Sequence, residues 1–169
     1  MNLVFQYTAM IPSFLFRLLV IFLLGNTLLM GQTKPSQPLP LTAKEVKALG
    51  YGNMSFRQKK TDVWQLANGI TVYSSRPYGG HICGFAGPTP VFIAVNAKGK
   101  ITGIVPAPNG ETENYFSYLH EDKFFNSWNG MTLKEAAQYE PDAISGATYS
   151  SEAVKETVKV TASRLIIKK

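Results

Sequence analysis

The 169-residue sequence contains one cysteine and two histidines, and this scarcity rules out several kinds of site. Cys83 has no second cysteine to pair with, which excludes an intramolecular disulfide and a zinc site built from thiolates. His81 and His120 lie far apart and do not form the helical His-x-x-x-His pattern of zinc hydrolases. We therefore expect no metal site and no catalytic residue. We expect Cys83 to be a buried small apolar residue, with a reactive thiol as the less favoured alternative.

Signatures for dinucleotide and nucleic-acid binding are also missing. No Gly-x-Gly-x-x-Gly loop follows a predicted strand, so direct binding of a nicotinamide dinucleotide has no support. Lys and Arg number 17 against 11 Asp and Glu, which gives a formal net charge of +6. These basic residues are scattered, with only short pairs such as Lys59-Lys60. Because no DNA- or RNA-binding motif accompanies them, we interpret them as solvated surface and expect no nucleic-acid partner.

Long apolar runs are absent except near the N-terminus. Residues 18–30 form a short apolar run that Arg17 precedes and Gly31 follows. A run of roughly 7 to 15 residues is typical of a secretory signal, whereas a spanning helix needs about 20. We expect residues 1–31 to be a signal peptide or an N-terminal anchor and the proline-containing residues 32–41 to be a linker. The protein is then expected outside the cytoplasm, in the periplasm or cell envelope.

Residues 42–169 have the length of one domain, for which the pattern predicts an α+β fold, an antiparallel β-sheet packed with helices. Asn68-Gly69 between two β-rich runs is a strong hairpin signal, and a second pair of runs follows. Apolar residues at helical spacing, from Val154 to Leu165, predict a long C-terminal helix. The expected helices cover residues 42–49, 133–139 and 149–167, and the expected strands cover 62–67, 70–75, 90–96 and 101–105.

Two further segments could lie near a ligand. The glycines and prolines of residues 84–90 let backbone approach a bound group, although this segment by itself favours an ordinary strand-connecting loop. Residues 111–139 are rich in aromatic side chains, which are more often core than cofactor contacts but can also stack on a flat ring.

The most specific segment runs from Asp142 to Thr148 and reads Asp-Ala-Ile-Ser-Gly-Ala-Thr, followed by Tyr-Ser-Ser and the predicted helix. A Ser or Thr before a helix is most often only its N-cap. A hydroxyl in a turn of small residues is, however, open to a modifying enzyme, and the amides that begin a helix can bind a phosphate. The segment therefore suits a phosphodiester attachment on Thr148.

This string resembles the flavinylation motif of the FMN-binding domain family, which occurs in peripheral subunits of the sodium-pumping NADH:quinone oxidoreductase and of the Rnf complex. The resemblance extends upstream to residues 84–88 and to Glu111-Thr112, although Glu113-Asn114 stands where those subunits usually have Pro-Gly. It implies that Thr148 carries FMN covalently, transferred by an FAD:protein FMN transferase that uses a divalent metal and releases AMP.

The resemblance also implies the cofactor-binding set and the role. Besides Thr148, the implied set is Asp142, Ser145, Gly146, Ala147, Glu111, Thr112, Tyr115, Gly87 and Pro88. The expected function is extracytoplasmic electron transfer with an unidentified redox partner, such as a membrane electron-transport complex, rather than stand-alone catalysis. One alternative is a module that binds FMN or another phosphorylated ligand reversibly, with Thr148 as a helix cap. A second is a structural domain without a cofactor.

Overall fold

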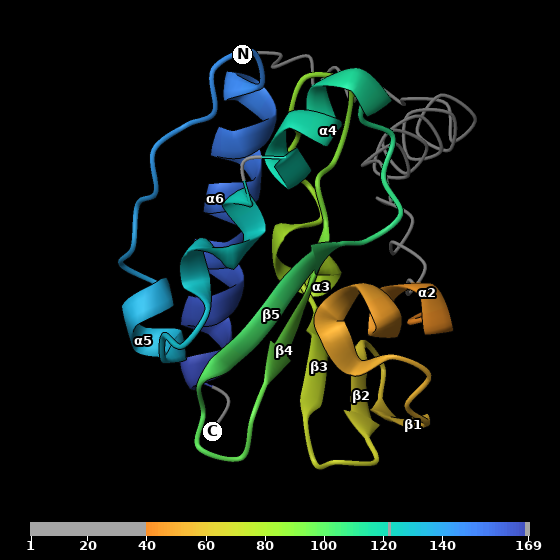
Figure 1. The fold of residues 1–169 in the computed structure, drawn as a ribbon. Helices are drawn as coiled ribbons and strands as arrows, with labels where there is room; N and C mark the ends of the chain where they lie inside the picture. The colour runs from red at the N-terminus through yellow and green to blue at the C-terminus, as the bar shows by residue number, and fades with distance from the viewer. Residues whose placement is uncertain (1–39, 122, 168–169) are drawn as a thin grey trace, which may run out of the picture. The chain divides into compact units, whose positions relative to one another are not determined.

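The computed structural model describes residues 40–121 and 123–167, without the side chain of Tyr115. The predicted leader, residues 1–31, and most of the predicted linker, residues 32–41, lie outside the described residues. The described part is an α+β fold, as predicted (Figure 1). Its elements are α2 (Ala43–Val46), η2 (Lys47–Tyr51), β1 (Phe56–Lys60), β2 (Val63–Leu66), β3 (Thr71–Ser74), α3 (Arg76–Gly79), β4 (Val91–Val95), β5 (Ile101–Pro106), α4 (Glu113–Glu121), η3 (Phe124–Trp128), α5 (Leu133–Ala136) and α6 (Thr148–Ile167).

The strands of the described chain form one sheet in the order β1-β2-β3-β4-β5, and every neighbouring pair is antiparallel. Both predicted hairpins are confirmed. In the first, Gly69 adopts φ +86°, and the Asn68 side chain accepts a hydrogen bond from the Ile70 amide at 3.1 Å. Strand β1 was not predicted because four of its five residues are exposed and polar, as is common at a sheet edge.

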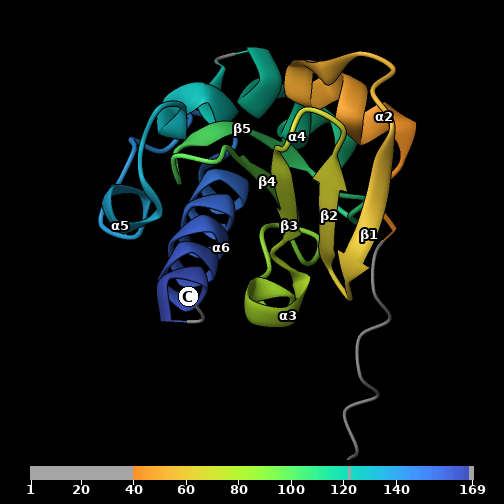
Figure 2. The same ribbon diagram turned by 90° about the horizontal axis from the view of Figure 1, so that it is seen from below.

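Strand β4 is buried on both faces and separates two parts of the core. Alternate side chains of a strand point to opposite faces, so Val91 and Ile93 pack with α6, while Phe92 packs with α2 and η2. Figure 2 shows α6 and α2 well apart, with the strands between them. The site-bearing helix α6 therefore rests on the most deeply buried strand.

Helix α6 is held by a buried stripe along its length. The predicted stripe from Val154 to Leu165 is confirmed, because Val154, Val158 and Ala162 are fully buried and Leu165 is nearly so. Thr161 is also fully buried, and its hydroxyl donates to the Thr157 carbonyl at 2.7 Å. This packing determines where the N-terminal end of α6 lies. None of the described helices is long and apolar enough to cross a membrane.

Two short helices are capped by side chains. Thr42 and Glu45 form a reciprocal capping box at the start of α2, and Thr132 and Glu135 do the same for α5. The predicted helix at 42–49 is thus confirmed, although its last turn is a π-helix in which Gly50 adopts φ +88°. Helix α5 is shorter than the predicted 133–139. Beyond Ala136 the Gln138 amide donates to the Glu135 carbonyl at 3.0 Å, so the chain leaves the helix through a tighter turn.

The aromatic segment contains a helix that was not predicted. In α4, Leu119 is fully buried and Phe116 nearly so, and Phe116 packs against Phe125 with ring centroids 6.0 Å apart. Most aromatics of this segment are therefore core, as Trp128 in η3 also shows. The loop between α3 and β4, the start of α6 and α4 gather at one end of the sheet (Figure 1).

The prediction that Cys83 is buried was wrong, since its side chain is exposed. Cys83 lies in the loop after α3, where it forms an isolated bridge with Pro88. Its thiol donates to the His81 carbonyl at 3.5 Å. The loop follows the surface, so an apolar neighbour in sequence does not bring Cys83 into the core.

The packing of α4 predicts a large effect of Leu119→Ala. Removing a fully buried leucine side chain should lower the free energy of unfolding by about 2–5 kcal/mol. The exposed Glu121→Ala, on the same helix, should change it by less than about 0.5 kcal/mol. Urea denaturation of both variants provides the measurement, and equal stabilities would contradict the packing described for α4.

Candidate functional site

The turn before α6 depends on a glycine. Gly146 adopts φ +80°, a backbone conformation that side chains with a Cβ rarely adopt. A Cβ at this position would lie 3.5 Å from the ring of Tyr118, so α4 packs close against the turn. The Ala147 amide donates to the Ile144 carbonyl at 3.0 Å and closes the turn. The chain thus enters α6 beside an aromatic ring of α4.

The first turn of α6 carries three aliphatic hydroxyl groups, those of Thr148, Ser150 and Ser151, and their surroundings differ. Ser150 is 1% exposed and donates to the Glu111 carboxylate at 2.6 Å. Ser151 is fully buried, where it accepts from the Ile144 amide at 3.1 Å and donates to the Thr148 carbonyl at 3.0 Å. Thr148 is exposed, and its hydroxyl has no hydrogen-bond partner among the described residues. It is the first helical residue and not the N-cap, because the first intrahelical acceptor is Ala147.

The helix also presents backbone donors at this point. The Ser151 amide makes the first intrahelical bond, to the Ala147 carbonyl at 2.9 Å. The amides of Thr148, Tyr149 and Ser150 precede it and have no partner within the helix. Together with the positive end of the helix dipole, such amides favour a negatively charged group such as a phosphate.

Glu111 joins this helix start to the loop at residues 84–88. Its carboxylate accepts hydrogen bonds from three consecutive amides, those of Phe85 at 3.3 Å, Ala86 at 2.9 Å and Gly87 at 3.0 Å. The same group accepts the Ser150 hydroxyl at 2.6 Å. The loop itself is closed by a bond from the Gly84 amide to the Gly87 carbonyl at 2.8 Å. One carboxylate therefore binds groups that lie 24 to 39 residues from it in the chain.

The surroundings of Glu111 act on its pKa in opposite directions. Burial raises the pKa, but the hydrogen bonds from Ser150, Ala86, Gly87 and Phe85 stabilise the charged form and outweigh burial. The net result is a pKa below the ordinary 4.5. Glu111 is therefore a carboxylate at neutral pH.

Gly84 allows the three segments to come close together. A Cβ at this position would lie 2.8 Å from Glu111 Oε1 and 3.1 Å from Ser150 Cα, both too near for an ordinary contact. Only a residue without a side chain lets the loop, Glu111 and α6 meet without a shift. This close packing explains why the loop begins with a glycine at position 84.

A hollow of about 250 Å³ lies beside Thr148. It is lined by Phe85 from the loop and by residues 146–150. Phe85 is 61% exposed and Tyr149 is 74% exposed, while Tyr118, over the Gly146 turn, is 43% exposed. Exposed aromatic side chains around a hollow can stack on a flat ring system.

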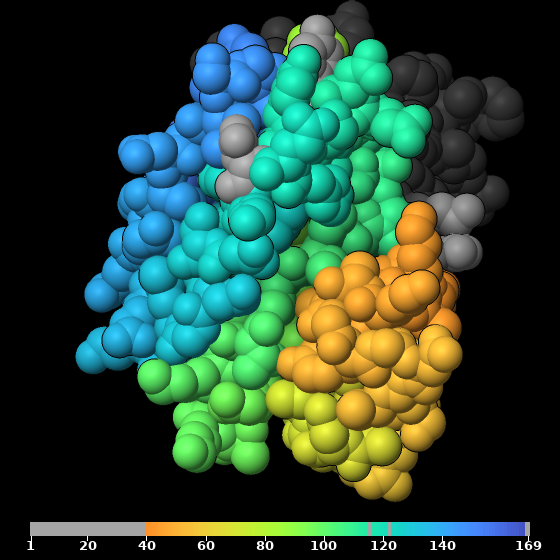
Figure 3. All heavy atoms as spheres, in the orientation of Figure 1, coloured from red at the N-terminus to blue at the C-terminus, as the bar shows by residue number. Residues whose placement is uncertain are grey.

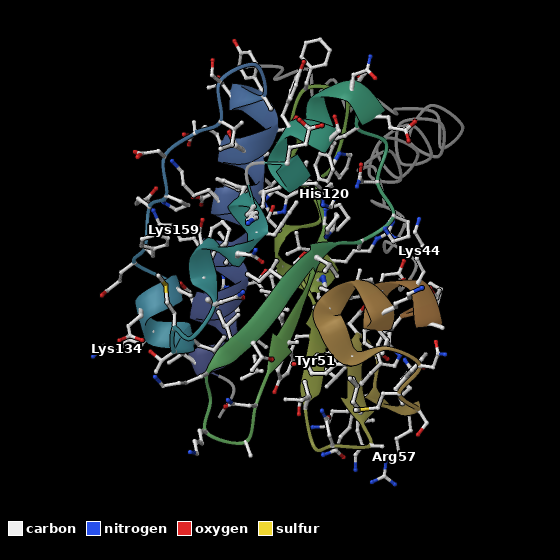
Figure 4. The ribbon with its side chains drawn as sticks, viewed as in Figure 1. Lys44, Tyr51, Arg57, His120, Lys134 and Lys159 are labelled. Atoms are coloured by element: carbon white, nitrogen blue, oxygen red, sulfur yellow. The ribbon has the colours of Figure 1, made fainter. Side chains whose placement is uncertain are left out.

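A larger hollow of about 600 Å³ lies between α2, the end of β5 and α4. Its lining includes Lys44, Phe116 and His120, and Glu111 borders it as well. Figure 4 labels Lys44 on α2 and His120 on α4. Figure 3 shows the orange residues of α2 and the teal residues of α4 on the same face of the molecule, with green residues of β5 between them.

The structure brings together some of the predicted site residues and leaves others apart. Glu111 and Gly87 meet in the loop contact, and Gly146, Ala147 and Thr148 line the smaller hollow. Pro88 closes the base of the loop opposite Cys83, and the carbonyl of Thr112 accepts the Phe116 amide at 3.1 Å, at the start of α4.

The remaining predicted residues have no contact that ties them to this cluster. Asp142 and Ser145 are exposed, and neither side chain has a hydrogen bond or ion pair with another described residue. The side chain of Tyr115 lies outside the described part of the structure.

Four residues of the site lie outside the predicted cofactor-binding set: Ser150, Phe85, Tyr118 and Tyr149. Of these, Ser150, Tyr149 and Phe85 belong to the segments that the sequence singled out, but no role was predicted for them. Ser150 lies 39 positions from its partner Glu111, and no local pattern links the two. Apolar residues three apart, Phe116 and Leu119, could have indicated α4 and hence an outward-facing Tyr118. In the described residues, no group of three or more His, Cys, Asp and Glu side chains could hold a metal ion.

A comparison with family models matches residues 84–163 to the family described as FMN-binding domain. The matched segment begins at the loop glycine and ends within α6, so it contains the loop, Glu111, α4 and the first turn of α6. Neither the comparison with curated proteins nor that with solved structures found a match.

The contact at Gly84 predicts that Gly84→Ala destabilises the protein. The added methyl group must displace Glu111 or the α6 backbone, which should lower the free energy of unfolding by about 1–3 kcal/mol. Gly110→Ala is the matched control, because nothing lies within 4 Å of a Cβ there, and its effect should stay below about 0.5 kcal/mol. Chemical denaturation of both variants tests this, and a neutral Gly84→Ala would refute the close contact.

The lowered pKa of Glu111 predicts a pH-dependent stability difference between the natural protein and Glu111→Gln. Because the folded protein binds this proton less readily than the unfolded chain does, the carboxylate stabilises the fold above the ordinary pKa of 4.5. That contribution is lost as the pH falls through the lowered folded pKa.

The difference in free energy of unfolding between the two proteins should thus be largest near neutral pH and shrink under acid conditions. Urea unfolding at a series of pH values measures it. Glu156→Gln, an exposed substitution on α6, controls for the loss of one negative charge. A difference that does not change with pH would show that Glu111 is not held as a carboxylate.

Proposed function

Through residues 84–163 this chain belongs to the FMN-binding domain family, and we propose that it carries FMN covalently on Thr148 as an extracytoplasmic electron-transfer protein. The family assignment establishes FMN binding. The covalent bond, the export and the electron-transfer role are the parts proposed here.

The exposed Thr148 hydroxyl is the observation that carries this proposal. Its neighbours Ser150 and Ser151 are buried and already hydrogen-bonded, so neither can be reached by a modifying enzyme without opening the helix start. Thr148 is exposed, and the amides beside it can bind the phosphate that the attachment would introduce. Its position as the first helical residue argues against the alternative in which it serves only as an N-cap.

The attachment is a balanced group transfer. Thr148 Oγ1 forms a bond to the phosphorus of the FMN half of FAD while the pyrophosphate bond breaks and AMP leaves. The hydroxyl proton passes to a base of the FAD:protein FMN transferase, which supplies the divalent metal. The protein substrate contributes an accessible hydroxyl and, afterwards, helix amides that stabilise the remaining negative charge.

The surroundings of Thr148 suit a flavin ring. Phe85, Tyr118 and Tyr149 offer exposed aromatic side chains near the point of attachment, and the hollow of about 250 Å³ lies among the residues next to it. Bound FMN supplies the redox chemistry, while the protein supplies the attachment and the orientation. An exposed position lets a protein partner approach, which suits a carrier more than a closed enzyme.

The proposed partners follow from this chemistry. The transferase installs the cofactor, and an unidentified redox protein, such as a membrane electron-transport complex, exchanges electrons with it. We place the protein in the periplasm or cell envelope, on the basis of the leader expected at residues 1–31. A covalent tether has a physical use there, because a flavin released into that space would be diluted and lost.

A second candidate is reversible binding of FMN or another phosphorylated ligand. The hollow beside Thr148 and the first amides of α6, which have no partner within the helix, favour it, since both would bind a phosphate without a covalent bond. The two candidates differ in whether flavin survives denaturation.

Co-expression with an FAD:protein FMN transferase should yield a fluorescent band on a denaturing gel, and Thr148→Val should abolish it. Valine has nearly the shape of threonine but no hydroxyl, so the fold should remain. Thr148→Ser should retain the label because it keeps the oxygen. Intact mass should show one added FMN in the natural protein.

Two other outcomes are informative. Flavin that binds the folded protein but is lost on denaturation would favour the reversible module. Label that persists in Thr148→Val would assign the bond to another hydroxyl, of which the exposed Ser145 is the nearest in the motif. For the carrier role, membranes of the source organism should reduce the flavin of the labelled natural protein, and failure to do so would contradict it.

A further inference from the structure

We propose that Glu111 is a positioning residue for the modification of Thr148: its carboxylate holds the loop at residues 84–88 against α6 and thereby fixes the first turn from which the Thr148 hydroxyl projects. The inference rests on the proposed attachment at Thr148. It assigns Glu111 a role through Ser150 and the loop, and not through contact with the cofactor.

The loop amides form an anion-binding concavity that is already filled. Three consecutive N–H groups, from Phe85 to Gly87, converge on the Glu111 carboxylate at 2.9 to 3.3 Å. Successive amides in such an arrangement bind anions. Because Glu111 occupies this concavity from within the chain, these amides are not available to a phosphate, which leaves the amides at the start of α6 for that group.

The link to Thr148 runs through one short hydrogen bond. Ser150 donates to Glu111 Oε2 at 2.6 Å and lies two residues after Thr148, in the same helical turn. A bond to a charged acceptor is stronger than a neutral one, and this one is only partly exposed. Any movement of Ser150 therefore moves the backbone that carries Thr148.

The close contact at Gly84 makes the arrangement rigid. Glu111 and the Ser150 backbone both lie against Gly84, so the loop, the carboxylate and the start of α6 are tightly packed at this point. Loss of the carboxylate charge would weaken the bonds from three amides and one hydroxyl together. The expected consequence is a displaced or mobile first turn, with the surface around it otherwise kept.

A direct role of Glu111 toward the phosphate is physically unfavourable. Its lowered pKa keeps the group negatively charged at neutral pH, and two anions repel each other. Its oxygens are also already occupied by four donors. Positioning is the role that these contacts support.

The test compares modification kinetics of the full chain and its variants. Purified transferase, FAD and Mg²⁺ are mixed with the unmodified natural protein, Glu111→Gln or Ser150→Ala, and intact mass follows the gain of FMN. Misplacement of a reacting group by about 1 Å can cost about 100-fold in rate, and we expect a loss of this order in kcat for Glu111→Gln. Ser150→Ala removes only the hydrogen bond from Ser150 to Glu111, and its kcat should fall about tenfold.

The Michaelis constant for the acceptor protein separates positioning from recognition. If Glu111 acts by positioning, kcat falls while this constant stays close to that of the natural protein. The control Glu156→Gln, which removes an exposed charge on the same helix, should leave both unchanged. A higher Michaelis constant at normal kcat would mean that the transferase reads Glu111 directly, and this would overturn the inference.

Hydrogen exchange of the unmodified protein gives a second readout that needs no cofactor. The amides of Phe85, Ala86 and Gly87 should exchange faster in Glu111→Gln than in the natural protein, while those of β4 should not change. If Glu111→Gln does not fold, Ser150→Ala decides the question, since it keeps the carboxylate and its loop bonds.

The possible failures can be told apart. Natural protein that remains unmodified on Thr148 refutes the proposed function, and this inference with it. If the natural protein is modified and Glu111→Gln and Ser150→Ala are modified at the same kcat, the inference is refuted and the proposed function stands.

Discussion

The site depends on the partly buried carboxylate of Glu111. Glu111 accepts hydrogen bonds from three amides of the loop at 84–88 and from the hydroxyl of Ser150 in α6, so it joins segments that are 24 to 39 residues away in the chain. A charged acceptor is suited to this because it can satisfy several donors at once.

The rest of the fold positions the loop at 84–88, Glu111 and the start of α6 next to one another. Strand β4, buried on both faces, supports α6 through Val91 and Ile93, and the buried stripe of α6 sets where its first turn lies. Helix α4, anchored by Leu119, brings Tyr118 against the turn at Gly146. The sheet and its two core clusters are thus the frame on which a small surface site is held at one end.

Among neighbouring hydroxyl groups, burial and hydrogen bonding decide which one is available for chemistry. Ser150 and Ser151 have the same chemical group as Thr148 but use it inside the protein. An engaged, buried hydroxyl must lose its partners before it can react, whereas Thr148 loses nothing on modification. This difference arises from the fold, and it explains how an enzyme could choose one of the three aliphatic hydroxyl groups at the start of α6.

Features that depend on neighbours in the chain were determined by the sequence alone. The Asn68-Gly69 hairpin, the apolar strand β4 and the long helix α6 all follow from local sequence patterns. FMN binding was implied by the resemblance of the contiguous motif ending at Thr148 to that of a known family. The tertiary structure decided the rest: the polar edge strand β1, the exposure of Cys83, and the meeting of Glu111 with Ser150 and the loop amides. Those contacts join residues far apart in the chain, and only the packed core determines which distant groups come within hydrogen-bond distance.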